Sequence, residues 1–142
     1  MIEFASEDLD NKRWYSVSVA PNQLFQMHTY GGRNSRLLSL QNNIFKSKNL
    51  AARKRENWFP SICFIKDLRT ILVMGGSLDS EQYKTVEKYK FSENIWDKIA
   101  NMNVKRAGAS SCYHRGYVYI FCGITTGSKK VNSFERLSTD NL

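Results

Sequence analysis

Residues 71–76 read ILVMGG, four apolar residues followed directly by two glycines. A short apolar run bounded by glycines is typical of a buried β-strand that ends in a sharp turn. Two other stretches end in a similar way, HTYGG at 28–32 and YIFCG at 119–123. The recurrence indicates a repeated structural unit, and its marker residues are Gly31, Gly32, Gly75, Gly76 and Gly123.

The distances between matching residues support a single repeat. Gly76 and Gly123 are 47 residues apart, and so are Asn94 and Asn141. Gly32 and Gly76 are 44 residues apart, which we attribute to a shorter loop after Gly32. A longer offset of 51 residues is assigned to four extra residues in a turn around 66–68. The pairs at this offset are Asn43 and Asn94, Phe45 and Trp96, and Arg55 and Arg106.

Each repeat has the pattern of four antiparallel strands. The last copy predicts a tight hairpin centred on Arg115-Gly116 and a third strand at 131–137. The middle copy predicts its third strand at 85–91 and a fourth strand around Trp96. Four short strands in each repeat are typical of the blades of a β-propeller, so the predicted fold class is all-β.

The repeats resemble those of the kelch family. The family pattern is an apolar strand closed by two glycines, a tyrosine near the end of the third strand, a tryptophan in the fourth, and an arginine that opens the next blade. The middle copy matches throughout, with Gly75-Gly76, Tyr89, Trp96 and Arg106, whereas the third copy has Cys122 as its first doublet residue. The resemblance implies a kelch-type β-propeller fragment of consecutive four-stranded antiparallel blades.

The chain accounts for fewer blades than a propeller ring needs. Propellers have about 4–8 blades, whereas the repeat pattern supplies fewer than three. We therefore expect a fragment of a longer propeller, or copies that associate to complete the ring, and not a ring closed by this chain alone. The predicted units are an acidic N-terminal segment at 1–12, a degenerate first blade at 13–48, a second blade at 49–98, and a third blade at 99–142 that stops before its fourth strand.

Five residues lead to local expectations. Cys122 in place of a glycine indicates that only the second doublet residue needs a positive φ, where a Cβ costs about 1–2 kcal/mol. Pro60 falls inside the expected first strand of the middle blade, where only an unpaired edge tolerates proline. Trp14 is expected in the first strand of the first blade, and Trp96, like Tyr89, is expected to pack between adjacent blades.

The composition is that of a globular domain. The 142 residues are 42% hydrophobic, and no apolar run approaches the roughly 18 residues that span a bilayer. The N-terminal stretch is acidic and lacks the apolar centre of a signal peptide. Cys63, Cys112 and Cys122 have no metal-binding spacing, so reduced thiols are expected. We expect a cytoplasmic protein of a eukaryotic cell, with the nucleus or the cytoskeleton as alternative locations.

The densest positive charge lies at 46–55. The same region is the one candidate for a helix, and we predict a solvated loop between blades over 46–56. A nuclear-localisation signal or a nucleic-acid patch is the alternative, but no aromatic stacking platform accompanies the charge. The net charge of +8 also leaves electrostatic binding of nucleic acid or of an anionic membrane as an alternative function.

The expected blade geometry gathers one set of loops. The start of the first strand and the end of the second lie on the same edge, so the loops 33–36, 77–83 and 124–130 should form one rim. The resemblance implies that this rim binds segments of a partner protein, and arginine forks suit acidic side chains. The predicted function is therefore a non-catalytic protein-interaction module of the adaptor or scaffold type. Its candidate partner-binding residues are Arg33, Arg36, Arg55, Arg106, Lys129 and Lys130, with a structural role on inter-blade carbonyls as the alternative for Arg55 and Arg106.

No residue pattern predicts catalysis. The two histidines, His28 and His114, are expected on strands of different blades, and no G-x-S-x-G, H-E-x-x-H or P-loop motif is present. Some kelch-like propellers are enzymes, including copper-radical oxidases, so an enzyme for a small sugar-like or peptide substrate stays an alternative. No catalytic residue, metal site or cofactor is predicted.

Overall fold

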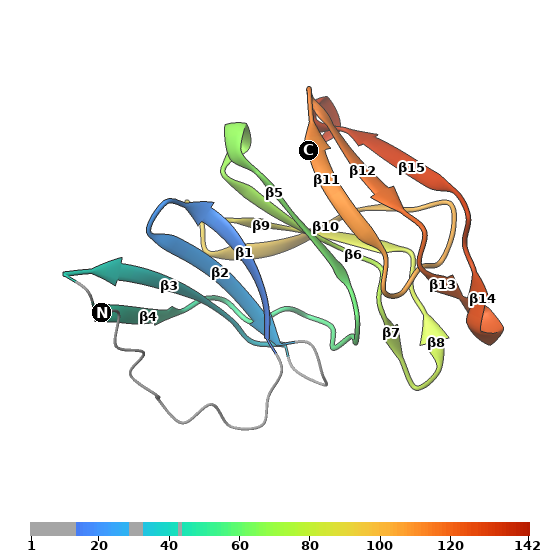
Figure 1. Ribbon diagram of the computed structural model, residues 1–142, viewed down its shortest axis with the longest axis horizontal. Helices are drawn as coiled ribbons and strands as arrows, with labels where there is room; N and C mark the ends of the chain where they lie inside the picture. The colour runs from blue at the N-terminus through green and yellow to red at the C-terminus, as the bar shows by residue number, and fades with distance from the viewer. Residues whose placement is uncertain (1–13, 29–32, 43) are drawn as a thin grey trace.

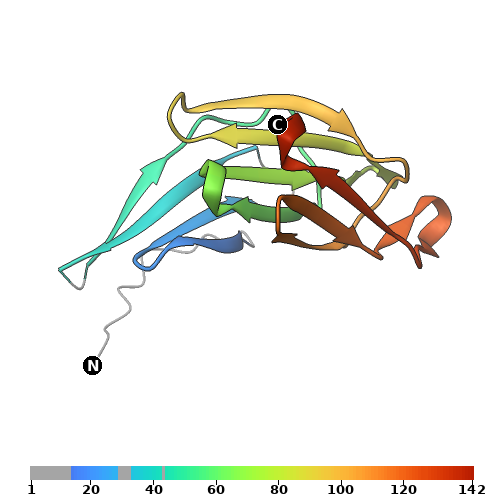
Figure 2. The ribbon, with the colours of Figure 1, turned by 90° about the horizontal axis from the view of Figure 1, so that it is seen from above.

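The computed structural model describes residues 14–28, 33–42 and 44–142. Three antiparallel β-sheets follow one another along the chain (Figure 1), and Figure 2 shows the second sheet between the first and the third. The first sheet has the order β1-β2-β3-β4, the second β10-β9-β6-β5 and the third β11-β12-β15. The strands are β1 (Trp14–Ala20), β2 (Gln23–His28), β3 (Ser35–Gln41), β4 (Ile44–Asn49), β5 (Ser61–Ile65), β6 (Thr70–Met74), β9 (Thr85–Lys90), β10 (Ile95–Asn101), β11 (Ser110–His114), β12 (Tyr117–Phe121) and β15 (Phe134–Ser138).

Short elements fill the connections between these strands. Two small ribbons, β7-β8 and β13-β14, leave the second and third sheets on the same side of the molecule (Figure 1). The described residues contain no α-helix, and the three sheets do not close into a ring. The prediction of an all-β chain of consecutive antiparallel sheets is confirmed, while the blade limits at 13–48, 49–98 and 99–142 stay predictions. The short elements are η1 (Lys66–Leu68), β7 (Ser77–Leu78), β8 (Glu81–Gln82), β13 (Ile124–Thr125), η2 (Thr126–Ser128), β14 (Lys129–Lys130) and η3 (Thr139–Asn141).

The hairpin centred on Arg115-Gly116 is confirmed. β11 and β12 pair without a break, and the two turn residues have φ angles of 46° and 79°. A two-residue turn with both φ angles positive twists in the sense that the flanking strands require. The third strand is shorter than the predicted 131–137, because Lys129–Lys130 pair with β13 and β15 begins only at Phe134.

Two expectations about single strands were wrong. The predicted loop 46–56 is a strand over its first four residues, because they pair with β3 and complete β4. Pro60 lies directly before β5 and not inside it, so its missing N–H removes no hydrogen bond from the sheet. Trp14 begins β1, as expected.

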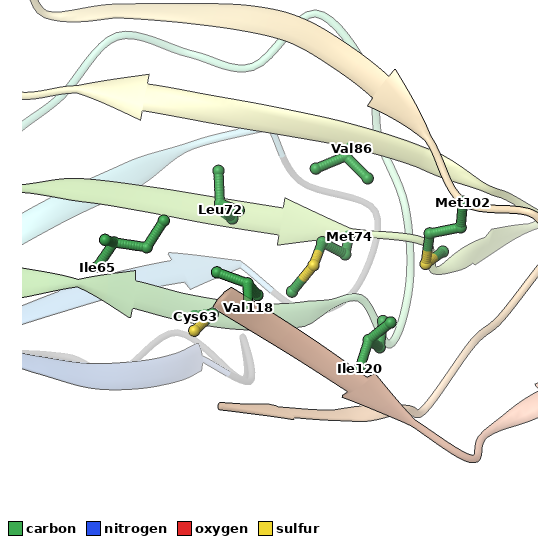
Figure 3. Close-up of a cluster of buried hydrophobic side chains, with 8 residues drawn as sticks. All are labelled: Cys63, Ile65, Leu72, Met74, Val86, Met102, Val118 and Ile120. Atoms are coloured by element: carbon green, nitrogen blue, oxygen red, sulfur yellow. The ribbon is translucent and has the colours of Figure 1, made fainter. Parts of the chain in front are cut away.

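Apolar side chains fill both gaps between neighbouring sheets. On β6, Ile71 and Val73 face the first sheet while Leu72 and Met74 face the third, because successive side chains of a strand alternate. The stretch ILVM is therefore apolar throughout because both of its faces are buried. The first gap contains Phe25, Met27, Ile71, Val73, Tyr89 and Trp96, and the second contains Cys63, Ile65, Leu72, Met74, Val86, Met102, Val118 and Ile120 (Figure 3).

Tyr89 and Trp96 pack between the first two sheets, as expected. Their ring centroids lie 6.2 and 6.3 Å from the ring of Phe25 on β2. Trp96 is 6% exposed, and its Nε1 donates a hydrogen bond of 2.8 Å to the carbonyl of Ala51. The indole therefore ties the fourth strand of one sheet to the segment that leaves the sheet before it.

We expect Trp96→Phe to lower the free energy of unfolding by about 1–2 kcal/mol, because the hydrogen bond to Ala51 is lost in a buried place. The apolar ring contacts stay largely in place, since phenylalanine fills most of the same space. Urea unfolding followed by far-ultraviolet circular dichroism measures the difference. An unchanged unfolding midpoint would mean that the indole contributes only its bulk.

In the first sheet, the residues that occupy the repeat positions differ from those matched by spacing along the sequence. The backbone N–H of His28 bonds to the carbonyl of Asn34, as that of Gly75 bonds to Thr85 and that of Cys122 to Ser133. His28 therefore occupies the place of the first doublet residue. The expected doublet Gly31 and Gly32 lies outside the described residues.

The match of Phe45 with Trp96 is also wrong. Phe45 pairs with Leu40 and is 44% exposed, whereas Trp96 pairs with Tyr89 and is buried. Only two residues connect β3 to β4, whereas four residues connect β9 to β10. Equal spacing along the chain thus did not correspond to equal position in the sheet.

Both residues of the doublet adopt a left-handed backbone. Gly75 and Gly76 have φ angles of 64° and 98°, and Cys122 and Gly123 have 55° and 91°. The expectation that only the second residue needs a positive φ was wrong, because Cys122 adopts one despite its Cβ. A Cβ on Gly75 would lie 2.2 Å from the carbonyl oxygen of Arg106. The doublet therefore lets the segment that leads to the third sheet pass directly against it.

Candidate functional site

Arg106 is the centre of a buried hydrogen-bond cluster at one end of the third sheet. Its side chain is 0% exposed, and Nη1 donates to the carbonyls of Cys122 and Ser133 at 2.9 and 2.8 Å. Nη2 donates to the Ser133 hydroxyl at 2.9 Å and to Glu135 Oε1 at 3.2 Å. Glu135 also accepts from the backbone N–H groups of 103 and 104. The guanidinium thus holds together the loop that follows β12.

Arg53 occupies the corresponding place in the second sheet. It is 2% exposed and forms an ion pair with Glu87 on β9. Its Nη1 also donates to Asn57 Oδ1 at 2.6 Å, and Asn57 Nδ2 donates to the carbonyl of Gly75 at 2.6 Å. Burial lowers the pKa of the Arg53 guanidinium, and the Glu87 carboxylate opposes that change. Arg106 therefore bonds directly to the carbonyl of the doublet residue Cys122, whereas Arg53 is linked to the carbonyl of Gly75 through Asn57.

The structural counterpart of Arg106 is Arg53, and the match with Arg55 was wrong. Trp58 bridges to Ser77 as Ala107 bridges to Ile124, so Asn57 stands at the backbone position of Arg106. The guanidinium of the second sheet then comes from four residues upstream. A signal for this role was present in the sequence, because each third strand has a glutamate near its start: Glu87 is the third residue of β9 and Glu135 is the second residue of β15.

Burial removes Arg106 from the candidate partner-binding residues. A side chain with no exposed surface cannot touch a partner, so the expected contact is corrected to a structural role. Arg55, in contrast, is exposed, and its guanidinium lies 5.7 Å from the centre of the Tyr83 ring. Arg33 is also exposed and lies 3.9 Å from Glu56, and Arg36 donates to Gln26 on β2.

The exposed cations gather on one side of the stacked sheets. We call this side the loop rim and define it by residues 33–36, 53–58, 77–83, 105–108 and 124–130; it lies below the sheets in Figure 1. Lys129 and Lys130 form β14 and are exposed. Cations outnumber acids on the rim, so its surface is positive. The cations with exposed surface are Arg33, Arg36, Lys54, Arg55, Lys105, Lys129 and Lys130, and the acids are Glu56, Asp79 and Glu81.

Buried side chains beneath the rim loops, and not exposed ion pairs within them, hold these loops in place. Lys105 and Glu81 lie 3.1 Å apart with 42% and 64% of their side chains exposed, and such pairs are worth about 0–1 kcal/mol. The buried groups around Arg53 and Arg106 instead fix the loop backbones. The rim therefore presents its cations on a supported surface.

The described histidines and thiols are spread over the three sheets. His28 lies on the first sheet and His114 on the third. Burial raises the pKa of the Cys63 thiol to about 12, and the neighbouring Cys112 adds to this rise while a hydrogen bond from Ser111 opposes it. Among the described residues no group of three or more His, Cys, Asp or Glu side chains is placed to hold a metal ion.

Comparison with known proteins agrees with this geometry. The family model described as the Kelch motif matches residues 69–103. Protein C13 of Swinepox virus (strain Kasza) is 39% identical over 46 residues, which is 32% of this chain and 9% of that protein. The chain reported as "Structure of YjhT" superimposes with a TM-score of 0.69 at 20% identity, over 81% of this chain and 34% of that chain. No described helix is long and apolar enough to cross a membrane.

Proposed function

We propose that this chain, whose residues 69–103 match the Kelch motif, is a non-catalytic protein-interaction module that binds acidic segments of a partner protein on the loop rim. Its role would be that of an adaptor or scaffold, in the cytoplasm or associated with the nucleus or cytoskeleton. The loop rim is the observation that carries the proposal, since it places exposed cations from all three sheets on one side of the molecule.

The chemistry of the rim favours carboxylate-rich segments. Arg55 lies over the Tyr83 ring, which limits its motion and presents its fork to solvent. Arginine and lysine bind carboxylates through charge-assisted hydrogen bonds, and an arginine fork can bind both oxygens at once. An extended acidic segment lying along the rim could therefore meet cations from successive sheets.

The proposal predicts that a fluorescein-labelled peptide of about twelve residues rich in Asp and Glu binds the chain. The double variant Lys129→Glu/Lys130→Glu should weaken this binding at least about tenfold, because two attractive charges become repulsive. Fluorescence anisotropy titrations at matched ionic strength measure the dissociation constants.

A matched control places the same charge change at the opposite end of the sheets. Lys66 and Arg115 are exposed in the turns between β5 and β6 and between β11 and β12. Lys66→Glu/Arg115→Glu alters the net charge equally but leaves the rim intact. Equal weakening by both double variants would mean that net charge alone attracts the peptide, and would contradict recognition by the rim.

A further inference from the structure

The third sheet has an aromatic face on the side away from the second sheet. Tyr117, Tyr119 and Phe121 alternate along β12, with neighbouring ring centroids 6.3 Å apart. Phe134 on β15 lies 6.4 Å from both Tyr119 and Phe121 and is 62% exposed. Arg136 lies 4.7 Å above the Tyr117 ring. Phe134 is exposed and the other three rings are partly exposed, and a connected aromatic surface of this kind marks a place that another molecule covers.

The aromatic face continues an interface that the chain already makes. In the second sheet, Met74 pairs with Val86 and both are buried under the third sheet. Phe121 and Phe134 pair in the same row of the third sheet. Tyr119 likewise takes the place of buried Leu72. The aromatic face of the third sheet therefore corresponds to the face of the second sheet that packs against the third.

The free face of the first sheet has a polar row, next to a row that contains Leu24 and Leu38. There Ser16, Gln26 and Arg36 form one row across the strands, and Arg36 donates to Gln26 while Gln26 donates to Ser16, both at 2.9 Å. The same row of the second sheet contains apolar Ile62 and Val73. A second copy docked head to tail would bury this polar row against aromatic rings, at the cost of removing a guanidinium from water.

The first doublet residue of the third sheet also differs from that of the second sheet, against which the linker to the third sheet packs. Gly75 leaves room for the carbonyl of Arg106, because a Cβ there would lie 2.2 Å from that oxygen. Cys122 takes the same place with a similar φ of 55° and carries a Cβ. If another sheet packed on the third in the way that the third packs on the second, the backbone carbonyl of its linker would clash with the Cβ of Cys122.

We propose that the aromatic face binds the same face of a second copy of this chain, related by a twofold axis. An aromatic surface is complementary to itself, since offset and edge-to-face ring contacts form between like surfaces. Arg136 can lie over a tyrosine of the second copy as it lies over Tyr117. A twofold contact uses one face of each copy and stops at the dimer.

Sedimentation velocity of the full chain over about 1–300 µM tests the proposal, with half-dimerisation expected within this range. Each copy has a net charge of +8, so raising the salt from about 0.1 to about 0.5 M should strengthen the dimer. Phe134→Asp should raise the dissociation constant at least about tenfold, because a charge enters the aromatic contact. Phe45→Asp is the control, since Phe45 is 44% exposed on β4 in the first sheet.

Thiol labelling of the unmodified chain gives a second readout that needs no variant. Cys112 is exposed and shares a row with Tyr119, so maleimide should label it more slowly when the chain is concentrated. A monomer at all concentrations contradicts the proposal, and so does a series of oligomers beyond the dimer. Loss of the dimer in Phe45→Asp but not in Phe134→Asp would place the contact on the first sheet and also contradict it.

Discussion

Gly75→Ala is expected to lower the free energy of unfolding by about 2–5 kcal/mol, the sum of about 1–2 kcal/mol of backbone strain and about 1–3 kcal/mol of overpacking. Gly75 has a φ of 64°, which a residue with a Cβ adopts at a cost of about 1–2 kcal/mol. The new Cβ would also lie 2.2 Å from the carbonyl oxygen of Arg106 and 3.0 Å from Met102 Cε. The methionine can move, but the carbonyl belongs to the backbone between the second and third sheets. Urea unfolding followed by circular dichroism measures the loss.

Gly127→Ala separates the two contributions. Gly127 has a φ of 71°, close to that of Gly75, and a Cβ there would meet nothing within 4 Å. The control should therefore lose only the strain of about 1–2 kcal/mol. Equal losses in the two variants would mean that the close passage of the linker adds nothing to the requirement for glycine at Gly75.

Arg106→Ala is expected to lower the free energy of unfolding by about 3–5 kcal/mol, as removal of one partner of a buried ion pair does. The substitution leaves the Glu135 carboxylate, 15% exposed, without its guanidinium. It also removes the donors that bond to the carbonyls of Cys122 and Ser133. The loop that follows β12 loses its internal support, so its backbone amides should exchange faster with solvent.

Arg55→Ala is the matched control, because it removes an arginine from the same side of the molecule. Arg55 is exposed and lies over the Tyr83 ring, and such contacts are worth about 0.5–1 kcal/mol. Denaturant unfolding of both variants, with hydrogen exchange of residues 122–133, makes the comparison. Losses of similar size would contradict the structural role assigned to the buried guanidinium.

The strands and tight turns could be predicted from the sequence because their signals are local. The run at 71–74 predicted a buried strand, and Arg115-Gly116 predicted a two-residue turn. The packing of Trp96 against the preceding sheet followed from its place in the repeat. The strand and the turn depend on residues that are near one another in the chain, whereas the packing of Trp96 was expected from its position in the repeat.

The buried arginine of the second sheet could not be predicted in the same way. Loops absorb insertions, so equal spacing matched Arg106 with Arg55, whereas the strand register assigns its role to Arg53 through Asn57. His28 stands in for the first doublet residue for the same reason. Hydrogen-bond registers, which spacing does not report, decide which residues are equivalent.

The sequence by itself determined an all-β chain of repeated antiparallel sheets, because apolar alternation and turn residues act over a few positions. Only the tertiary structure decided which arginines are buried and which are exposed on the loop rim, because that depends on how linkers cross the ends of neighbouring sheets. It likewise decided that one free face is aromatic and that the other has the polar row Ser16, Gln26 and Arg36, since a face is assembled from several strands. Burial and ion pairing are properties of these assembled surfaces, and they separate residues of the same type into structural support and candidate binding surface.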